Sequence, residues 1–550
     1  MKRIVIVGGV AGGMSVATRL RRLDAEASIV VLERSGHVSY ANCGLPYFVG
    51  GVIEDETDLL VQTPESLHER FRLDVRVGHE VLRINPRRRS VLVRPLAGGQ
   101  EYELEYDILV LSPGATAIVP PIPGVERAYA LRTVEDAERL STVVEGSPRS
   151  AVVVGGGFIG LEVAENFARR GVGVAIVEAA TQVLAPLDPE MASVVTDELL
   201  RHGVAVHLAN GVESIGENSV TLTSGEVLEA ELVVVAIGVR PETTLARDAG
   251  LLIGPRGGIA VDGFNQTSDP AIYALGDAAE KMDALDGSAT LVPLANVANR
   301  HGRLVADHIA GREVRPRTTI GTAIVKVFDL TVAATGWNEK RLTAAGRRAV
   351  VIHTHPSSHA GYYPGAVPMS LKLLVDPVTG AILGAQGVGG EGVDKRIDVL
   401  ATAIRAGLSA VELADLELAY APPFGSAKDA VNMLGYVAEN VLSGLERTVQ
   451  WHEVDQWRSR GAMLLDVRSR AEFAAGSLPG AHNIPVDELR ERRGEIDTPS
   501  VVVYCQVGQR GHVAAQLLSH WGYEVANLDG GYATWSRSPA REGLAEALSR

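Results

Sequence analysis

A hydrophobic strand, a glycine-rich turn, a helix and a second strand follow one another twice in this chain, and this repeated pattern constrains the fold most. The first unit spans residues 3–33, and its turn reads Gly-Gly-Val-Ala-Gly-Gly. The second unit begins at Ala151, and its turn reads Gly-Gly-Gly-Phe-Ile-Gly. Glycines in such a turn let the backbone approach a pyrophosphate at the N-terminus of the helix. The sequence therefore predicts an α/β multidomain protein with two Rossmann-like nucleotide-binding domains.

Each unit also carries an acidic residue at the end of its second strand. Glu33 follows Gly8 by 25 residues, and Glu178 follows Gly155 by 23 residues. A carboxylate in this position receives a ribose hydroxyl of a dinucleotide. Because Glu178 would repel a 2′-phosphate, NADH is favoured at the second turn. NADPH stays open as the alternative, since two arginines at 169–170 lie on the intervening helix.

The chain has two cysteines in 550 residues, and each lies in a sequence that suits thiol chemistry. Cys43 lies in Ser-Tyr-Ala-Asn-Cys-Gly-Leu-Pro-Tyr, soon after the first unit, and Cys505 directly follows the apolar strand run 501–504. A protein of this length with two thiols has no structural disulfide framework. We therefore interpret both thiols as reagents and expect a cytoplasmic protein, because free thiols persist in a reducing compartment.

The charge balance and the apolar runs limit the partners. Lys and Arg number 52 and Asp and Glu number 67, which leaves a formal charge of −15 and argues against a general nucleic-acid binder. No apolar run approaches the length of a membrane-spanning helix. The chain begins directly with a strand, so we expect no signal peptide.

A segment near residue 270 identifies the first cofactor. Residues 267–277 resemble the second flavin signature of the pyridine nucleotide-disulfide oxidoreductases, and residues 111–115 and 236–241 also match that family. The resemblance covers residues 1 to about 443 and implies FAD at the first turn and NADH at the second. The domains it implies, together with the last part of the chain, are FAD-binding 1–115 and 246–320, NADH-binding 116–245, α+β dimerisation 321–443, a linker 444–451 and a C-terminal α/β domain 452–550.

The same resemblance assigns residues to each cofactor. The FAD-binding residues are Gly8, Gly9, Ala11, Gly12, Gly13, Glu33, Arg34, Ser112, Gly114, Ala115, Gly276 and Asp277. The NAD-binding residues are Gly155, Gly157, Phe158, Ile159, Gly160, Glu178 and Gly238.

Cys43 stands alone where ordinary members of the family carry two cysteines spaced C-x₄-C. Positions 38 and 48 are Val and Phe, so Cys43 has no partner at that spacing. A single thiol beside a flavin can cycle as a sulfenic acid or as a mixed disulfide with an outside thiol. We expect Cys43 to begin a short helix, whose N-terminal dipole would favour the thiolate.

Other motifs resemble the coenzyme A-disulfide reductases within this family. Ala11 occupies the turn in which NADH oxidases and peroxidases carry a histidine, and two tyrosine motifs lie at 361–365 and 419–424. The resemblance implies a homodimer in which Tyr362 and Tyr420 of the partner subunit donate protons to a leaving thiolate. Tyr363 is the alternative to Tyr362, and plain interface packing is the alternative to catalysis.

Coenzyme A, as substrate or carrier, needs cations for its phosphates. The positions that contact it in those reductases are Ser15, Arg19, Arg22, Ser39, Asn42, Asn299 and Lys428. On the residues alone, the arginine pair also suits a solvated helix face. Phe71 stands where a basic residue is expected, which permits smaller persulfides.

The last domain resembles a rhodanese throughout its length, on motifs at 465–473, 480–485 and 529–535 and on the loop from Cys505 to Arg510. Such a loop aims backbone N–H groups at one point, which holds an anion and, with Arg510, favours a thiolate. Its six residues suit sulfur better than the arsenate or phosphate chemistry of the longer loops. The sequence thus predicts an FAD-dependent NADH reductase of persulfides, polysulfides and coenzyme A disulfide, fused to a sulfane-sulfur transferase. Two alternatives are an NADH oxidase or peroxidase acting through a Cys43 sulfenate, and a sulfur-binding redox sensor.

Overall fold

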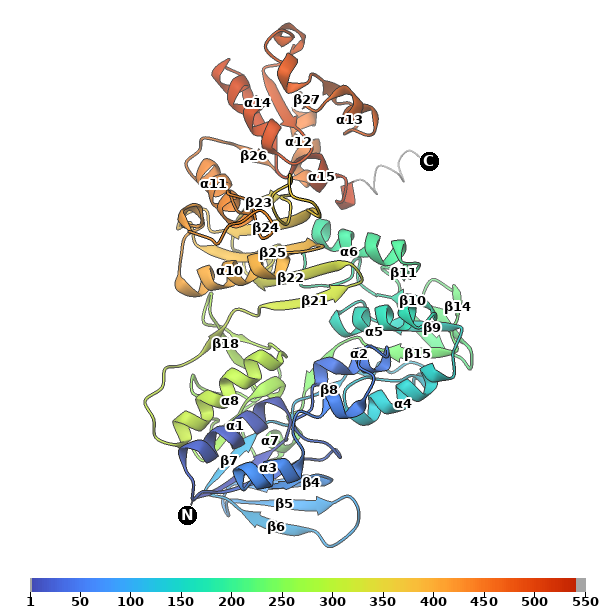
Figure 1. Cartoon of the computed structure of the whole chain (residues 1–550), viewed down its shortest axis with the longest axis vertical. Coiled ribbons are helices and arrows are strands. Elements are labelled where there is room, and N and C mark those ends of the chain that lie inside the picture. The colour runs from blue at the N-terminus through green and yellow to red at the C-terminus, as the bar shows by residue number, and fades with distance from the viewer. Residues whose placement is uncertain (1, 541–550) are drawn as a thin grey trace. The chain divides into compact units, whose positions relative to one another are not determined.

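The computed structural model describes residues 2–540 and divides into two compact units. The first unit contains the chain up to Thr181 together with His202–Gly321, and the second contains Gln182–Arg201 together with the chain from Thr322 onward. Figure 1 shows the elements of both. Among the described residues, no helix is long and apolar enough to cross a membrane.

A five-stranded parallel sheet forms the first nucleotide-binding domain, as predicted. Its strands in spatial order are β17 (Ile272–Ala274), β7 (Ile108–Leu111), β1 (Arg3–Val7), β2 (Ser28–Leu32) and β3 (Asp74–Arg76). The helices of this part are α1 (Ala11–Leu23), α2 (Leu45–Val49), α3 (Pro64–Phe71), α7 (Thr244–Asp248) and α8 (Ala295–Ile309). Because β17 pairs with β7, the chain returns to this sheet after leaving it for the second nucleotide-binding domain.

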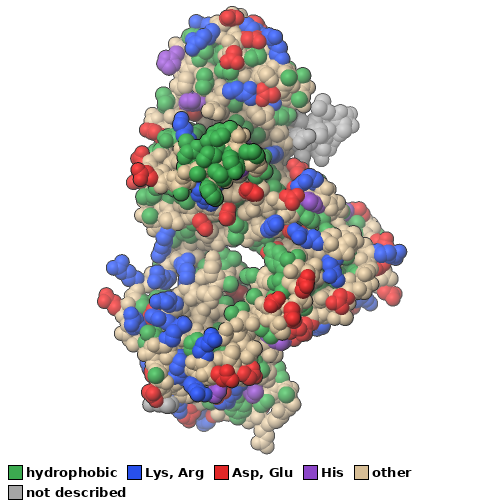
Figure 2. Space-filling view, viewed as in Figure 1, with side chains coloured by type: hydrophobic (Ala, Val, Ile, Leu, Met, Phe, Trp, Pro, Cys, Tyr) green, Lys and Arg blue, Asp and Glu red, His purple; other side chains and the backbone are tan. Residues whose placement is uncertain are grey.

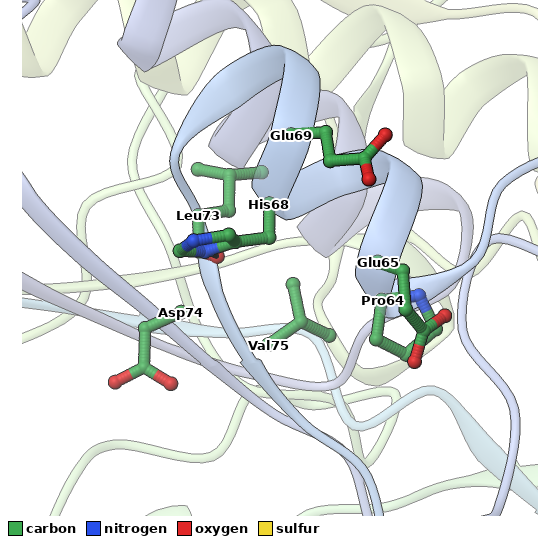
Figure 3. Close-up of a pocket in the computed structure, with 7 residues that line it drawn as sticks. All are labelled: Pro64, Glu65, His68, Glu69, Leu73, Asp74 and Val75. Carbon is green, nitrogen blue, oxygen red and sulfur yellow. Dashed lines mark hydrogen bonds between the residues drawn. The ribbon is translucent and has the colours of Figure 1, made fainter.

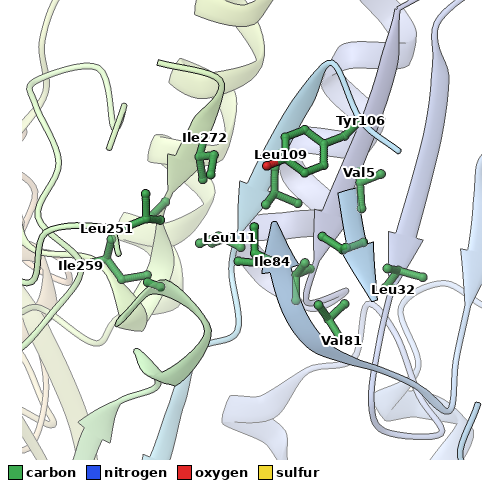
Figure 4. Close-up of a cluster of buried hydrophobic side chains, with 14 of the residues drawn as sticks. Val5, Leu32, Val81, Ile84, Tyr106, Leu109, Leu111, Leu251, Ile259 and Ile272 are labelled. Carbon is green, nitrogen blue, oxygen red and sulfur yellow. The ribbon is translucent and has the colours of Figure 1, made fainter. Parts of the chain in front are cut away.

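The core of this domain lies between the parallel sheet and an antiparallel one, β4 (His79–Asn85), β5 (Ser90–Pro95) and β6 (Tyr102–Glu105). Figure 4 shows Val81 and Ile84 of β4 beside Leu109 and Leu111 of β7. Burying a side chain of this size contributes about 1.5–3 kcal/mol. The core therefore fixes the strand ends that carry the glycine turn.

The second nucleotide-binding domain is also a parallel sheet. Its elements are β11 (Ala205–His207), β10 (Gly173–Val177), β9 (Ser150–Val154), β15 (Leu232–Val235) and the helices α4 (Val134–Glu145) and α5 (Phe158–Arg169). The next helix, α6 (Pro189–Arg201), belongs to the second unit although the sequence assigns it to this domain. α6 packs against the sheet of the dimerisation domain. The NADH-binding domain was predicted to span 116–245 without a break, whereas its contacts place α6 with the dimerisation domain.

An antiparallel five-stranded sheet organises the dimerisation domain. Its elements are β21 (Ala323–Val327), β22 (Leu330–Gly336), β25 (Ile382–Gly389), β24 (Met369–Val375), β23 (Val350–Thr354), α9 (Glu339–Ala344), α10 (Val393–Ala406) and α11 (Ala430–Leu442). Leu371 and Leu373 of the sheet pack with Leu400 of α10 and Leu434 of α11 in one core. α10 and α11 therefore pack on the sheet through apolar side chains.

The C-terminal domain is a parallel sheet with buried side chains on both faces. Its elements are β26 (Thr448–Val449), β30 (Glu524–Leu528), β29 (Ser500–Tyr504), β27 (Met463–Asp466), β28 (His482–Asn483), α12 (Val454–Ser459), α13 (Arg470–Ala474), α14 (Gln509–His520) and α15 (Gly531–Trp535). Along β29, Val501 and Val503 join one core and Val502 and Tyr504 the other, as the alternation of a strand requires. β26 is an edge strand of this sheet, so the domain begins within the stretch predicted as a linker.

Candidate active site

The first glycine turn joins β1 to α1 in a conformation that requires glycine. Gly8 has φ +97°, and a Cβ there would collide with the carbonyl oxygen of Ser112. A Cβ on Gly13 would collide with the carbonyl of Gly8. The Glu33 carboxylate accepts the backbone N–H of Gly9 at 2.8 Å. The helix α1 starts at Ala11, directly after this turn. The glycines, the Glu33 carboxylate and the start of α1 thus form one cradle that fits a dinucleotide.

The other residues predicted for FAD converge on this cradle. Added Cβ atoms on Gly12 and Gly276 would lie 2.7 and 3.4 Å from Ser112 Oγ. Asp277 forms a short 3₁₀ turn with its neighbours and pairs with Arg132 at 2.8 Å. Gly114 (φ +75°) and Ala115 form the loop and strand that follow β7. Arg34, in contrast, is exposed and lies 3.9 Å from Glu80.

The second turn has the same construction with a more open centre. Gly155 has φ +110°, and a Cβ on Gly160 would collide with the carbonyl of Gly155. Nothing lies within 4 Å of a Cβ built on Gly157, so the backbone is accessible just before Phe158 and Ile159 begin α5. The predicted Gly238 has φ +119° and precedes the short strand β16 (Val239–Pro241).

The Glu178 carboxylate closes this turn. It accepts the backbone N–H groups of Gly156 at 2.7 Å and Ala180 at 2.8 Å. Arg169 pairs instead with Glu165 at 2.8 Å, at the C-terminal end of α5. At a rise of about 1.5 Å per residue, that end lies roughly 16 Å from the glycine turn. The two arginines therefore do not face the position of a 2′-phosphate.

Cys43 lies in the 3₁₀ turn Asn42–Gly44, directly before α2, and is exposed. Loss of water around the thiol raises the pKa of Cys43, the Glu162 carboxylate raises it further, and Arg132 acts in the opposite direction. The expectation that a helix dipole favours the thiolate is wrong in this structure. The reason is that loss of water around the thiol disfavours its charged form, and the Glu162 carboxylate repels a second negative charge.

Glu162 was not predicted from the sequence. It lies on α5, two residues after Gly160, and the hydroxyl of Tyr47 donates to its Oε1 at 3.3 Å. Burial raises the pKa of Glu162 to about 7, although the bond from Tyr47 lowers it. At neutral pH this carboxyl can therefore both hold and release a proton near Cys43. The signal in the sequence is an acid on the helix, two residues after the last glycine of the turn.

The residues predicted for coenzyme A are engaged in several ways. Ser15 donates to Asn299 Oδ1 at 2.6 Å and thereby joins α1 to α8. Arg19 forms an ion pair with Asp307 at 2.7 Å, a partner that the sequence did not reveal. The guanidinium of Arg22 lies 6.0 Å from the centre of the Phe71 ring. The backbone N–H of Ser39 donates to the carbonyl of Gly9, and Asn42 directly precedes Cys43. Lys428 is exposed and belongs to the second unit.

The two predicted tyrosines meet. The hydroxyls of Tyr362 and Tyr420 lie 2.8 Å apart, and the side chains are 76% and 48% exposed. Tyr363 turns away and contacts the ring of His359. The buried ion pair Arg396–Asp429 lies behind these loops. Figure 2 shows a broad hydrophobic patch over the second unit in the region of α11.

Residues 505–510, here named the sulfur loop, connect β29 to α14. Cys505 is fully buried at the end of the strand. Both terminal nitrogens of Arg510 bind the Glu472 carboxylate, at 2.8 and 2.6 Å, a partner that the sequence did not reveal. This pair lowers the pKa of Glu472 to about 2. Below the loop, buried Arg468 donates to the Gln506 side chain at 3.0 Å.

The sequence matches the pyridine nucleotide-disulphide oxidoreductase family over residues 2–302, the dimerisation domain of that family over residues 322–431 and the rhodanese-like domain over residues 450–538. The chain belongs to the pyridine nucleotide-disulphide oxidoreductase family. Its members use FAD and NADH, and the two glycine cradles fit these groups.

Several relatives of this oxidoreductase are known. Coenzyme A disulfide reductase of Staphylococcus aureus is 35% identical over 441 residues, which is 80% of this chain and 100% of that protein. The structure of reduced Bacillus anthracis CoADR-RHD is 48% identical with a TM-score of 0.96, and covers 98% of each chain. A NAD-dependent persulfide reductase from A. fulgidus is 38% identical with a TM-score of 0.91, over 97% of this chain and 100% of that one.

A separate hollow lies between α3 and β3 of the oxidoreductase (Figure 3). Its lining includes His68, Glu69 and Asp74, and His68 contacts the carbonyl of Leu73 at 3.2 Å. None of the residues predicted for cofactor or substrate line it. This hollow is therefore distinct from the two cradles and from both cysteines.

Proposed function

We propose that this oxidoreductase uses NADH to reduce the S–S bond of persulfides, polysulfides and coenzyme A disulfide, and that its rhodanese domain transfers sulfane sulfur. The observation that carries the proposal is the environment of Cys43, a lone exposed thiol beside a carboxyl that exchanges protons near neutral pH. The names of the relatives, coenzyme A disulfide reductase and persulfide reductase, support the same substrate class.

The reductive reaction is a thiol–disulfide exchange at Cys43. The Cys43 thiolate attacks one sulfur of the substrate, a new S–S bond forms, and the other sulfur departs with the electron pair and takes up a proton. The first cradle would hold FAD, which would pass the electron pair of NADH to the oxidised Cys43 and so return it to the thiolate. In this proposal Glu162, whose carboxylate raises the pKa of Cys43, accepts the proton of the Cys43 thiol before attack. For a coenzyme A persulfide the sum is CoA–SSH + NADH + H⁺ giving CoA–SH + H₂S + NAD⁺.

The protein acts as a homodimer in this proposal, and the tyrosine pair of one subunit serves the Cys43 site of the other. A dimerisation domain is present, and the exposed aromatic side chains around Tyr362 and Phe424 suit an interface between copies. The hydroxyl pair of Tyr362 and Tyr420 would protonate the departing sulfur. Both free thiols suit the cytoplasm.

Sulfur supply takes place at Cys505. Its thiolate attacks the sulfane sulfur of a donor such as thiosulfate, and sulfite departs with the S–S electron pair. A carrier thiolate, such as that of coenzyme A, then attacks the outer sulfur and restores the Cys505 thiolate. The carrier persulfide is the substrate for Cys43.

Steady-state NADH oxidation with four acceptors tests the proposal. Coenzyme A persulfide and coenzyme A disulfide should support turnover at least tenfold faster than hydrogen peroxide or oxygen. Faster turnover with peroxide or oxygen would identify an oxidase or peroxidase acting through a Cys43 sulfenate. Sulfur binding without NADH oxidation by any acceptor would identify a redox sensor.

Nicotinamide choice is a second test of the proposed cofactor. Wild-type enzyme should have a lower KM for NADH than for NADPH, because the Glu178 carboxylate closes the turn and would repel a 2′-phosphate. In Glu178→Ala the ratio of the KM for NADPH to the KM for NADH should fall about tenfold, which corresponds to about 1.4 kcal/mol. Glu217→Ala, which changes an exposed acid of the same domain, is the control. A wild-type preference for NADPH would contradict the assignment.

A further inference from the structure

The segment after β30 packs against the back of the sulfur loop. The backbone N–H of Tyr532 donates to the carbonyl of Cys505 at 2.8 Å, and that of Ala533 donates to the carbonyl of Gln506 at 2.9 Å. A Cβ added to Gly531 would lie 2.5 Å from the Cys505 carbonyl oxygen. A shift of this segment would therefore move the backbone that carries the thiol.

Asp529 begins the same segment and binds the dimerisation domain. Both its carboxylate oxygens accept the backbone N–H of His353 at 3.1 Å, and Oδ2 lies 2.6 Å from His353 Nδ1. Gln450 donates to the same oxygen at 3.2 Å. A Cβ added to Gly530 would lie 2.7 Å from the Cβ of His353. The side chains of Asp529 and His353 are 3% and 1% exposed, so this contact is closely packed and excludes water.

The second ring nitrogen of His353 meets another carboxylate. Nε2 lies 3.0 Å from Oε1 of Glu190, near the start of α6, and Glu190 also binds Lys372. Burial lowers the pKa of His353, but the two carboxylates outweigh it and raise this pKa to about 9. Only an imidazolium donates from both nitrogens, so His353 is a cation between two anions. The carboxylates around Lys372 are Asp188, Glu190 and Glu339.

Further charged groups border this contact. His355 lies 2.8 Å from the Thr534 hydroxyl, and burial lowers the pKa of His355 to about 3, which leaves it neutral. Arg537 donates to Ser370 at 2.9 Å. Lys340 lies close to the acidic groups, and burial lowers its pKa. Around neutral pH, His353 is therefore the group whose charge joins Asp529 to the sheet.

We propose that His353, in the dimerisation domain, is a positioning residue for sulfur transfer at Cys505. The imidazolium holds Asp529, Asp529 fixes the segment behind the sulfur loop, and that segment holds the carbonyls of Cys505 and Gln506. This role rests on the proposed sulfur transfer at Cys505. It makes the rhodanese activity depend on a residue of the reductase part of the chain, so the C-terminal domain is not a freely tethered supplier.

Kinetics of the full-length, FAD-loaded enzyme test this role. His353→Asn leaves the buried Asp529 carboxylate without its cation, so kcat for thiosulfate-dependent sulfur transfer should fall at least tenfold, with KM within twofold. NADH-dependent reduction of coenzyme A disulfide should stay within twofold of wild type. His520→Asn, an exposed histidine of the C-terminal domain, is the control. Sulfur transfer by His353→Asn at the wild-type rate would overturn the proposal.

A double substitution separates this role from general damage to the fold. His353→Asn/Asp529→Asn removes the unpaired charge, so its kcat for sulfur transfer should be at least threefold higher than that of His353→Asn. A double variant slower than His353→Asn would show that the contact acts only as packing and would overturn the electrostatic role.

Hydrogen exchange of residues 505–512, followed by mass spectrometry, tests the positioning without any activity. Exchange should be faster in His353→Asn than in wild type or His520→Asn. In wild type, protection should fall as the pH rises through about 9, where the imidazolium loses its proton, and His353→Asn should lack this step. If wild type transfers no sulfur, the proposed function fails while the exchange still decides the role of His353. Equal exchange rates in wild type, His353→Asn and His520→Asn would overturn the positioning role of His353.

Discussion

The two thiols of this oxidoreductase are controlled in different ways. Cys43 is exposed in a short turn, where loss of water around the thiol and then the Glu162 carboxylate raise its pKa, while Arg132 lowers it. Cys505 is fully buried, and backbone hydrogen bonds to its own carbonyl hold its loop in place. Substitutions near Cys43 should therefore change chemistry, whereas substitutions near Cys505 should change position.

Among the substitutions near Cys43, Cys43→Ser should have the largest effect on S–S reduction. Turnover of every S–S acceptor should fall to background, because serine forms no mixed disulfide. The variant should keep its yellow FAD, its reduction by NADH and its thiosulfate-dependent sulfur transfer. Stopped-flow absorbance with NADH and steady-state assays with each acceptor measure these properties. Near-normal persulfide turnover would end the assignment of Cys43 as the reactive thiol.

Cys505→Ser should have the converse effect. Sulfur transfer from thiosulfate should be lost, while coenzyme A disulfide reduction should stay at the wild-type rate. The two activities are measured on the same preparation, with Cys43→Ser as the reciprocal control. Equal loss of both activities would show that the thiols form one obligatory relay.

The tyrosine pair comes next in size. Tyr362→Phe/Tyr420→Phe removes two hydroxyls that lie 2.8 Å apart and keeps both rings. Loss of a general acid should slow S–S reduction by ~10²-fold or more, and leave FAD binding and sulfur transfer unchanged. Tyr436→Phe, a partly exposed tyrosine on α11, is the control. Normal kcat in the double variant would show that the pair only packs at an interface.

The smallest effect concerns the pKa of Cys43. Glu162→Gln removes a carboxylate that raises this pKa, so alkylation of Cys43 by iodoacetamide should reach half its maximal rate at a lower pH than in wild type. Tyr47→Phe should raise the pKa of Glu162, because the Tyr47 hydroxyl lowers it. Alkylation of Cys505, followed on a separate peptide, should keep its pH dependence. An unchanged Cys43 profile in Glu162→Gln would remove Glu162 from the site.

The sequence predicted the fold well because the informative patterns are local. The apolar strand, the glycine turn and the helix after it defined β1 and α1. The glycine turns followed from spacing alone, and the structure explains why they need glycine at Gly8 and Gly155. Their acids, Glu33 and Glu178, lie on the turns as expected.

The chain by itself thus determined the kinds of domain and the two glycine turns, since these depend on residues close together in sequence. Only the tertiary structure decided which charged groups interact. Glu162 raises the pKa of Cys43, Asp307 pairs with Arg19, and Asp529 pairs with His353. Their partners lie up to 288 residues away, as in Arg19 and Asp307, and no local spacing marks them. Packing also reversed the expected pKa shift of Cys43, because loss of water around the thiol and the Glu162 carboxylate both raise this pKa.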